Sequence, residues 1–292
     1  MVQFASEYLR GGGHGERQEL HLGGGAKMNW KILPKKSDDL TEQLLINRNI
    51  KTKIEKELFF HPKLNYFKKD LQIPGIPKAL NRIKKAIKNE ELIIAYGDYD
   101  VDGVAGAAVL YLGLTSAGAK VLPYIPHREK EGYGLSKQGL EFARDSGASL
   151  VITTDTGIVS FDMADYAKEL GLDLIVTDHH QEQGSKRPDA FAIVHSIKLC
   201  GAAVTWALVK TLITKQADED LLDLVAIATV SDMMPLLGIN RCLVINGLEK
   251  LNQTKRVGLL ALFRQADLEI GKIGSYEIGH VIAPRLNAMG RM

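Results

Sequence analysis

Residues 98–103 read Asp-Tyr-Asp-Val-Asp-Gly, so that three carboxylates fall within five positions. An apolar run, residues 92–96, comes directly before this segment, and a helix-like stretch, residues 104–114, comes directly after it. Carboxylates this close repel one another unless a cation neutralises them. An EF-hand loop begins similarly, but it needs a bidentate Glu where this chain has Val109, and a helix rather than a strand before it. The pattern therefore favours a metal site at the carboxyl edge of a parallel sheet.

Acidic residues follow other apolar runs in the same way. Asp155 follows residues 150–154, and residues 178–180, Asp-His-His, follow residues 172–177. Asp232 follows an apolar, helix-like stretch. Because the carboxyl ends of parallel strands meet at one crevice, we expect these groups to lie together.

Each acidic residue also has a simpler explanation when taken alone. Asp155 could cap a helix, Asp178 could end a strand, and Asp232 could belong to a turn after a helix. Together, however, carboxylates with one or two imidazoles suit two Mn²⁺ or Mg²⁺ ions better than Zn²⁺. Two such ions stabilise the attacking and leaving oxygens of a phosphoryl displacement. Phosphoester hydrolysis is the chemistry that this pattern indicates.

Short apolar runs alternate with amphipathic stretches from residue 91 onward, which is typical of an α/β fold with a parallel sheet and helices on both faces. The predicted strands are residues 92–96, 121–125, 150–154, 172–177 and 191–194. The predicted helices are residues 104–116, 136–145, 161–170, 202–214 and 218–230.

The composition is that of an ordinary globular protein, with 45% hydrophobic and 25% charged residues among 292. The two cysteines, Cys200 and Cys242, have no paired spacing, which favours a reducing compartment. The sequence has neither a long uncharged apolar run nor a basic segment leading into an apolar one at its start. We therefore expect a cytoplasmic protein without a membrane partner.

The N-terminal part differs from the rest in charge. Residues 28–91 hold fifteen Lys and Arg against eight Asp and Glu. This surplus fits either solvated helix faces or a surface that follows a phosphate backbone. We predict a flexible extension at residues 1–27, such as a tag or an upstream mis-start, and a basic helical segment at 28–90. A catalytic domain follows at 91–250, and 251–292 would end it and begin a connector.

The motifs resemble those of the DHH phosphoesterase superfamily. Four ordered segments carry the resemblance, at residues 98–103, 155–158, 178–180 and 231–236. Gly-Tyr-Gly-Leu-Ser at 132–136, Leu-Cys-Gly-Ala-Ala-Val at 199–204, and the Pro-Arg-Leu-Asn-Ala stretch from residue 284 are similar to the RecJ single-stranded-DNA exonuclease branch. The resemblance implies stepwise hydrolysis of single-stranded DNA from its 5′ end.

The resemblance also implies a role for individual residues. Five residues would ligate the two Mn²⁺ or Mg²⁺ ions: Asp100, Asp102, Asp155, His179 and Asp232. Asp98 and His180 would lie in or beside this shell as catalytic residues, with His180 contacting the scissile phosphate or supporting a ligand. Tyr133, Arg285 and Arg291 could contact the substrate, although the two arginines could equally brace the acidic edge of the sheet.

Some features depart from the family pattern. Chains of this branch continue past the equivalent of Met292 into a second domain that closes over the nucleic acid, so we expect a truncated nuclease or a fragment. His195 stands where Asn is usual, and His280 where an aromatic is usual; both are interpreted as tolerated substitutions. A small-substrate phosphoesterase and a catalytically silent nucleic-acid-binding module remain the alternatives. The sequence indicates neither protein partners nor an oligomeric state.

Overall fold

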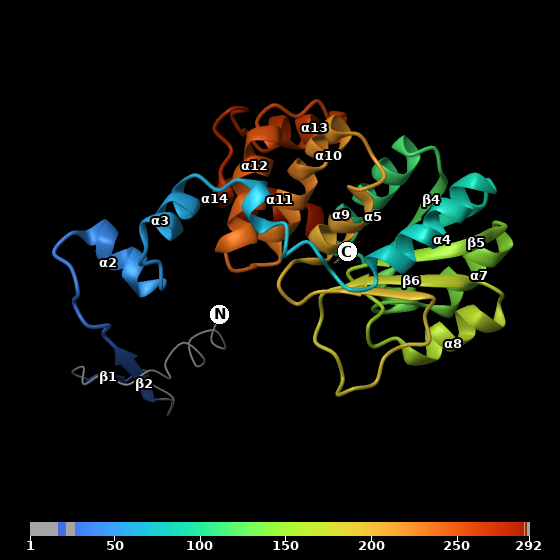
Figure 1. The fold of residues 1–292 in the computed structure, drawn as a ribbon, viewed down its shortest axis with the longest axis horizontal. Coiled ribbons are helices and arrows are strands. Elements are labelled where there is room, and N and C mark those ends of the chain that lie inside the picture. Colours follow the sequence, from blue (N-terminus) through green and yellow to red (C-terminus); the bar gives the residue numbers. More distant parts are fainter. Residues whose placement is uncertain (1–16, 22–26, 289, 291–292) are drawn as a thin grey trace. The chain divides into compact units, whose positions relative to one another are not determined.

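The computed structural model describes residues 17–21, 27–288 and 290, and the chain forms two compact units, residues 1–61 and residues 62–292. Figure 1 labels the helices and strands. The first unit contains a two-stranded antiparallel sheet and two helices: β1 (Arg17–His21), β2 (Lys27–Lys31), α2 (Leu40–Asn47) and α3 (Lys53–Phe60).

Local capping explains where the helices of the first unit begin. The Asp39 carboxylate accepts the Glu42 backbone N–H at the start of α2, and Thr52 forms a capping box with Glu55 at the start of α3. Strand β1 lies within the segment that we expected to be a flexible extension; the remaining positions before residue 27 lie outside the described residues. The expected flexibility of residues 1–27 stays a prediction.

The second unit is built on a five-stranded parallel sheet of order β4-β3-β5-β6-β7. Every predicted strand is confirmed to within two residues at either end. The strands are β3 (Leu92–Gly97), β4 (Lys120–Tyr124), β5 (Ala148–Thr154), β6 (Asp173–Asp178) and β7 (Ala192–His195). Since β3 pairs in parallel with both β4 and β5, the chain crosses over from β3 to β4 and from β4 to β5 through helices.

Alternating side chains of the strands pack against two different layers of helices. Figure 1 shows these helices on either side of the sheet. In β3, Ile93 and Ala95 face a core shared with α4 (Ile76–Lys88), α5 (Val101–Ser116), α9 (Gly201–Val209) and α11 (Leu222–Ser231). Ile94 and Tyr96 face the opposite core, which α7 (Lys137–Asp145) and α8 (Phe161–Glu169) complete. This arrangement confirms the expected α/β fold with helices on both faces.

A third core joins the C-terminal helices around Ile227, Phe263 and Ile282. The other elements of the second unit are η1 (Leu64–Phe67), α6 (Arg128–Glu131), α10 (Lys215–Asp220), α12 (Gly238–Leu251), α13 (Val257–Gln265), α14 (Ser275–Glu277), the π-helical η2 (Ile278–Ile282) and α15 (Ala283–Ala288). None of the described helices is long and apolar enough to span a membrane.

Several sequence-based boundaries differ from the structure. The helix predicted for residues 202–214 ends at Val209, because Thr214 instead caps the next helix by accepting the Ala217 N–H. The helix predicted for residues 218–230 is two helices, with Leu221 ending α10 and preceding α11. Helix α4, which we assigned to the N-terminal basic segment, is part of the layer that covers the sheet.

Buried Arg82 joins α4 to the amino edge of the sheet. Its Nη2 lies 2.6 Å from Glu91 Oε2, its Nε lies 2.5 Å from Asp173 Oδ2, and its side chain is 5% exposed. Together these two pairs connect α4 to the segments that begin β3 and β6.

We expect Arg82→Ala to lower the free energy of unfolding by about 3 kcal/mol, because it leaves Glu91 without its buried partner. Urea denaturation of the metal-free protein measures this decrease. The matched control is Arg144→Ala, whose ion pair with Asp145 is exposed and whose removal should cost less than about 1 kcal/mol. Equal decreases in the two variants would contradict the structural role of Arg82.

Candidate metal centre

Three neighbouring strands deliver an aspartate to the same edge of the sheet. Gly97 of β3 pairs with Thr154 of β5, which pairs with Thr177 of β6. An aspartate comes directly after each of these paired residues: Asp98 after Gly97, Asp155 after Thr154 and Asp178 after Thr177. All three aspartates are at most 2% exposed. The register of the sheet therefore decides which carboxylates lie side by side.

The first aspartate segment turns directly into α5. Asp100 caps this helix, because its Oδ1 accepts the Gly103 N–H at 3.0 Å. The helix starts at Val101, three residues earlier than predicted, so Asp102 lies in its first turn. A side chain at Gly103 would place Cβ 2.4 Å from the Asp98 nitrogen. Glycine is thus required for the helix to begin this close to the strand end.

Asp102 is held by the first turn of another helix. Its Oδ2 accepts the Gly201 N–H at 2.6 Å and its Oδ1 accepts the Ala202 N–H at 2.8 Å, both from α9. Helix N-termini favour negative charge, so this contact stabilises a carboxylate that is only 3% exposed. A Cβ on Gly201 would lie 2.6 Å from the Asp155 Cβ. The start of α9 is therefore fitted between the two aspartates.

His179 lies at the centre of the carboxylates. Its Nε2 is 3.0 Å from Asp155 Oδ1 and 3.6 Å from Asp102 Oδ2, whereas its Nδ1 is 3.7 Å from Asp232 Oδ2. Asp232, which ends α11, is more accessible than Asp102 and Asp155, with 31% of its side chain exposed. All five predicted ligands, including Asp100, fall within three overlapping groups whose ligand atoms lie within 4.8 Å of one another.

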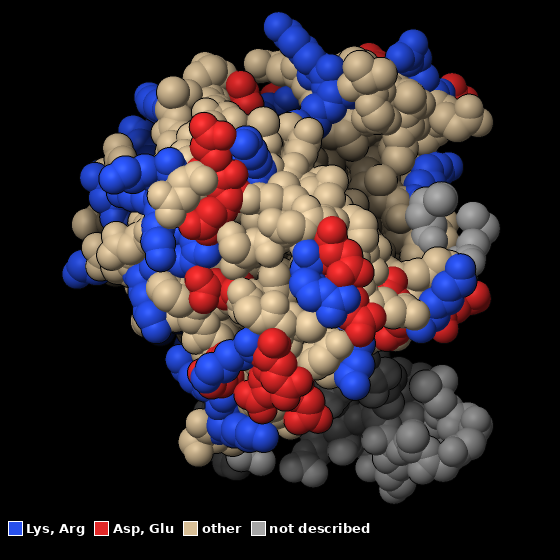
Figure 2. Space-filling model, turned by 90° about the vertical axis from the view of Figure 1, so that its right-hand side faces the viewer, with Lys and Arg blue, Asp and Glu red and all other residues tan. Residues whose placement is uncertain are grey.

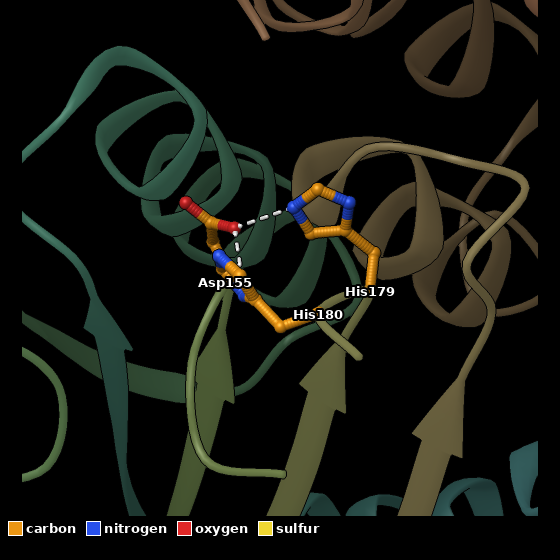
Figure 3. A group of neighbouring side chains, drawn as sticks. All are labelled: Asp155, His179 and His180. Carbon is orange, nitrogen blue, oxygen red and sulfur yellow. Dashed lines mark ion pairs between the residues drawn. The ribbon is translucent and has the colours of Figure 1, made fainter. Parts of the chain in front are cut away.

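His180 is oriented by Asp178 and faces outward. Asp178 Oδ1 lies 2.8 Å from His180 Nδ1, while its Oδ2 accepts the Ile158 N–H at 2.8 Å. His180 Nε2 is 3.1 Å from the Tyr133 hydroxyl, and Nδ1 is 3.8 Å from Asp155 Oδ1. Figure 3 shows Asp155 between the two histidines. Asp178 is thus a positioning residue, a role that its place in the Asp-His-His motif did not reveal.

The crowded carboxylates resist ionisation. Burial, together with the neighbouring carboxylates, raises the pKa of Asp98 to about 6 and that of Asp232 to about 7. Burial likewise raises the pKa of Asp102 and, with the surrounding aspartates, the pKa of Asp155 well above its usual range. A cation that replaced the missing solvation would let these groups ionise at neutral pH.

The pKa values of the two histidines are shifted in opposite directions. Burial lowers the pKa of His179, which favours the neutral imidazole that binds metals. The hydrogen bond to Asp178 raises the pKa of His180. For Asp178 itself, burial raises the pKa, but hydrogen bonds from His180 and Ile158 outweigh it and leave the pKa lowered. Asp178 therefore stays charged while it holds His180.

The donor set fits a pair of divalent cations. Among the described residues, Asp98 Oδ1 and Asp155 Oδ1 are buried and take part in no hydrogen bond. Buried carboxylate oxygens normally have a hydrogen-bond partner. Asp98 Oδ1 lacks one, and Asp155 Oδ1 has only the imidazoles of His179 and His180 near it, so both oxygens could bind an ion. Carboxylate oxygens with a single imidazole suit Mn²⁺ or Mg²⁺.

Other predicted residues lie around this centre or apart from it. Tyr133 is 53% exposed and borders His180. Arg285 of α15 donates a hydrogen bond from Nη1 to Val281 O of η2 and has no ion pair with any described carboxylate. Both roles expected for Arg285 stay predictions. Arg291 lies outside the described residues.

Asn287, which the sequence showed only as part of the Pro-Arg-Leu-Asn-Ala stretch, directly contacts the start of α5. Asn287 of α15 accepts the Val101 N–H through Oδ1 at 3.0 Å, and so binds the start of α5. A Cβ on Gly290 would lie 2.7 Å from Tyr99 O, in the first aspartate segment. The C-terminal stretch of the described chain thus supports that segment, although no charge or periodicity in the sequence indicates it.

The fold and the site define an α/β protein with a carboxylate-rich cluster that could hold metal ions at the carboxyl edge of its parallel sheet. Residues 92–229 match the family described as "DHH family, N-terminal domain". The chain therefore contains a DHH-family N-terminal domain.

Similar proteins include RecJ exonucleases. The chain is 41% identical over 288 residues to the "Single-stranded-DNA-specific exonuclease RecJ" of Bacillus subtilis. The aligned region covers 91% of this chain and 36% of that protein. It is 33% identical over 285 residues to the Escherichia coli protein of the same name, covering 89% of this chain and 48% of the relative. The chain thus spans less than half the length of either relative.

Solved structures show the same likeness. A crystal structure of exonuclease RecJ bound to manganese superposes with a TM-score of 0.66 at 34% identity, covering 75% of this chain and 58% of that one. RecJ from Thermus thermophilus in complex with Mn²⁺ has a TM-score of 0.64 at 32% identity, covering 75% and 33%. The fold of the DHH domain is therefore shared with proteins whose structures contain Mn²⁺.

We expect Mn²⁺ to raise Tm more at about pH 8 than at about pH 5.5. In the metal-free protein, the raised carboxyl pKa values mean that the folded state holds protons more tightly than the unfolded chain. These groups therefore stabilise the fold at low pH and lose that contribution as pH rises through about 4 to 7. A cation removes the penalty only where the carboxylates are ionised. Thermal unfolding with and without Mn²⁺ measures the effect, and an equal shift at both pH values would contradict it.

We expect Gly201→Ala to weaken Mn²⁺ binding and to destabilise the fold by about 1–3 kcal/mol, because the new methyl group would overlap Asp155. Calorimetric titration with Mn²⁺ and urea denaturation measure the two effects. Gly258→Ala in α13 is the matched control, since a Cβ there meets no atom within 4 Å and should leave metal affinity unchanged. Unchanged Mn²⁺ affinity in Gly201→Ala would contradict the fitted contact.

Proposed function

We propose that this chain is the core of a metal-dependent exonuclease that hydrolyses single-stranded DNA from the 5′ end. The observation that supports it best is the convergence of the carboxylates and His179 from separate strand ends onto one site. The cluster alone indicates phosphoesterase chemistry. Because the chain is similar to RecJ exonucleases, we infer that its substrate is single-stranded DNA.

Five residues would hold two Mn²⁺ or Mg²⁺ ions. They are Asp100, Asp102, Asp155, His179 and Asp232, whose ligand atoms lie within the three overlapping groups. Bound ions of this kind supply Lewis-acid activation of water and neutralise charge on the phosphoryl oxygens. The chain itself contributes a rigid set of donors, because Asp102 is hydrogen-bonded to α9 and Asp100 caps α5.

Two residues beside the ligands would act on the substrate, and a third would complete the ligand shell. His180 is held by Asp178 and is 43% exposed in its side chain, so its Nε2 can reach a phosphate oxygen. Tyr133, whose hydroxyl lies near this nitrogen, would compete for or share that contact. Asp98 is buried behind them, and its free Oδ1 would complete the ligand shell.

The cellular role follows from the substrate. An enzyme that degrades single-stranded DNA acts where chromosomal DNA is repaired or recombined, which in a bacterial cell is the cytoplasm. Single-stranded nucleic acid would be its principal partner.

The test incubates the chain with a 3′-labelled single-stranded DNA and Mn²⁺ and follows product length with time. Asp155→Asn should lower the rate by more than the roughly 10–100-fold that removal of an outer-shell partner costs. Asparagine suits this position because Asp155 has a left-handed backbone, with φ of 62°. Asp189→Asn, which affects only an exposed ion pair with Lys168, is the control.

The outcomes separate the proposed function from its alternatives. Shortening from the labelled strand's 5′ end that is abolished in Asp155→Asn supports the exonuclease. Faster cleavage of dinucleotides than of long strands would instead indicate a small-substrate phosphoesterase. Mn²⁺ and DNA binding without any cleavage would indicate a nucleic-acid-binding module.

A further inference from the structure

Two cavities lie on opposite sides of the metal centre. One, of about 740 Å³, has largely apolar walls and includes residues 125–129, which follow β4. The other, of about 670 Å³, has polar walls and includes residues 195–198, which begin at the end of β7. Since β4 and β7 are the two outer strands of the sheet, the metal centre at β3, β5 and β6 lies between these cavities.

The second of these, which we name the β7 cavity, is formed by three segments that meet at the carboxyl edge: residues 69–74, 181–187 and 195–198. Its walls include three cationic side chains, Lys69, Arg187 and Lys198. Neutral hydrogen-bonding groups, among them Gln72, Gln181 and Ser196, complete the polar surface. A cavity of this composition suits an anion that is bound by both charge and hydrogen bonds.

Two of the three cations are available to a ligand. Arg187 is already paired, with its Nη2 2.6 Å from Glu182 Oε1. Within the part of the chain that the structure describes, neither Lys69 nor Lys198 forms an ion pair through its ammonium group. Asp70 is the other acidic residue of the lining, so that the cavity carries a net charge of about +1.

A direct hydrogen bond connects the β7 cavity to the metal centre. His195, in the cavity wall, donates from Nε2 to His180 O at 2.7 Å, and it pairs with Asp178 in the β6–β7 register. Two strand spacings, about 10 Å, separate the path of β5 from that of β7. A strand whose scissile phosphate lies at the carboxylates could therefore place a later phosphate in the cavity.

Lys and Arg side chains also lie outside the β7 cavity. Figure 2 shows a face on which Lys and Arg side chains are scattered among Asp and Glu side chains. Lys84, Lys85 and Lys88 belong to the end of α4 that leads into the start of β3. They thus lie toward the amino edge of the sheet, away from the carboxylates.

We propose that the β7 cavity binds a backbone phosphate of single-stranded nucleic acid, beyond the bond that is cleaved. The inference rests on the proposed function, because it takes a nucleic-acid strand to be what reaches the carboxylates. Lys69 and Lys198 provide the charge, and Gln181 and Ser196 provide hydrogen bonds to phosphate oxygens. The subsite therefore serves long strands, whereas a dinucleotide is too short to use it.

Binding of a fluorescent oligothymidylate to the Asp155→Asn protein, followed by anisotropy over a range of salt concentrations, tests the proposal without requiring cleavage. The double variant Lys69→Ala/Lys198→Ala should bind several-fold more weakly. The slope of log K against log salt should shrink by about 0.7 for each phosphate that the variant no longer neutralises. Lys84→Ala/Lys85→Ala removes the same charge elsewhere and should leave the slope nearly unchanged. Lys69→Arg/Lys198→Arg should restore it.

The proposal would be overturned by an unchanged salt slope in the Lys69→Ala/Lys198→Ala variant or by an equal change in the Lys84→Ala/Lys85→Ala variant. It would also be overturned if the parent Asp155→Asn protein did not bind the strand at low salt. The proposed function is judged separately, by cleavage with the unsubstituted Asp155. Binding with the expected slopes but without cleavage would support the subsite and reject the exonuclease. Cleavage with unchanged slopes would support the exonuclease and reject the subsite.

Discussion

The mutual repulsion of buried aspartates is the constraint on which the rest of this structure depends. Asp98, Asp102, Asp155 and Asp178 are each at most 3% exposed, and they lie together at one edge of a sheet. Such a cluster costs free energy unless hydrogen bonds or cations offset it. The backbone supplies part of that compensation, and the remaining unsatisfied oxygens are where an ion would bind.

Helix starts and close backbone contacts provide this compensation. Helix α9 donates two N–H groups to Asp102, and Gly201 lets it approach Asp155 to a distance that no side chain would allow. Asp178 uses its oxygens to orient His180 and to accept the Ile158 N–H. The ligands are therefore fixed by elements that are far apart in sequence, which is how a rigid site forms before any ion binds.

Sequence patterns predicted the sheet well because buried parallel strands are short, apolar and bounded by helices. They were less accurate where a helix boundary depends on competition between caps. Thr214 caps α10 instead of ending the helix predicted to reach it, and Leu221 divides the next predicted helix. The left-handed backbone of Asp155 and the role of Asn287 had no local signal, since both depend on what packs against them.

By itself, the sequence determined the α/β class, the strand ends and the residue types able to bind divalent metals, because these follow from periodicity and local spacing. Only the tertiary structure decided that Asp178 positions His180 while His179 faces three other carboxylates. It also decided that Arg285 of α15 donates a hydrogen bond to Val281 O of η2 and that lysines before α4 and after β7 share one cavity. The physical reason is that packing sets the direction of side chains and their long-range contacts. A local sequence pattern contains no information about that packing.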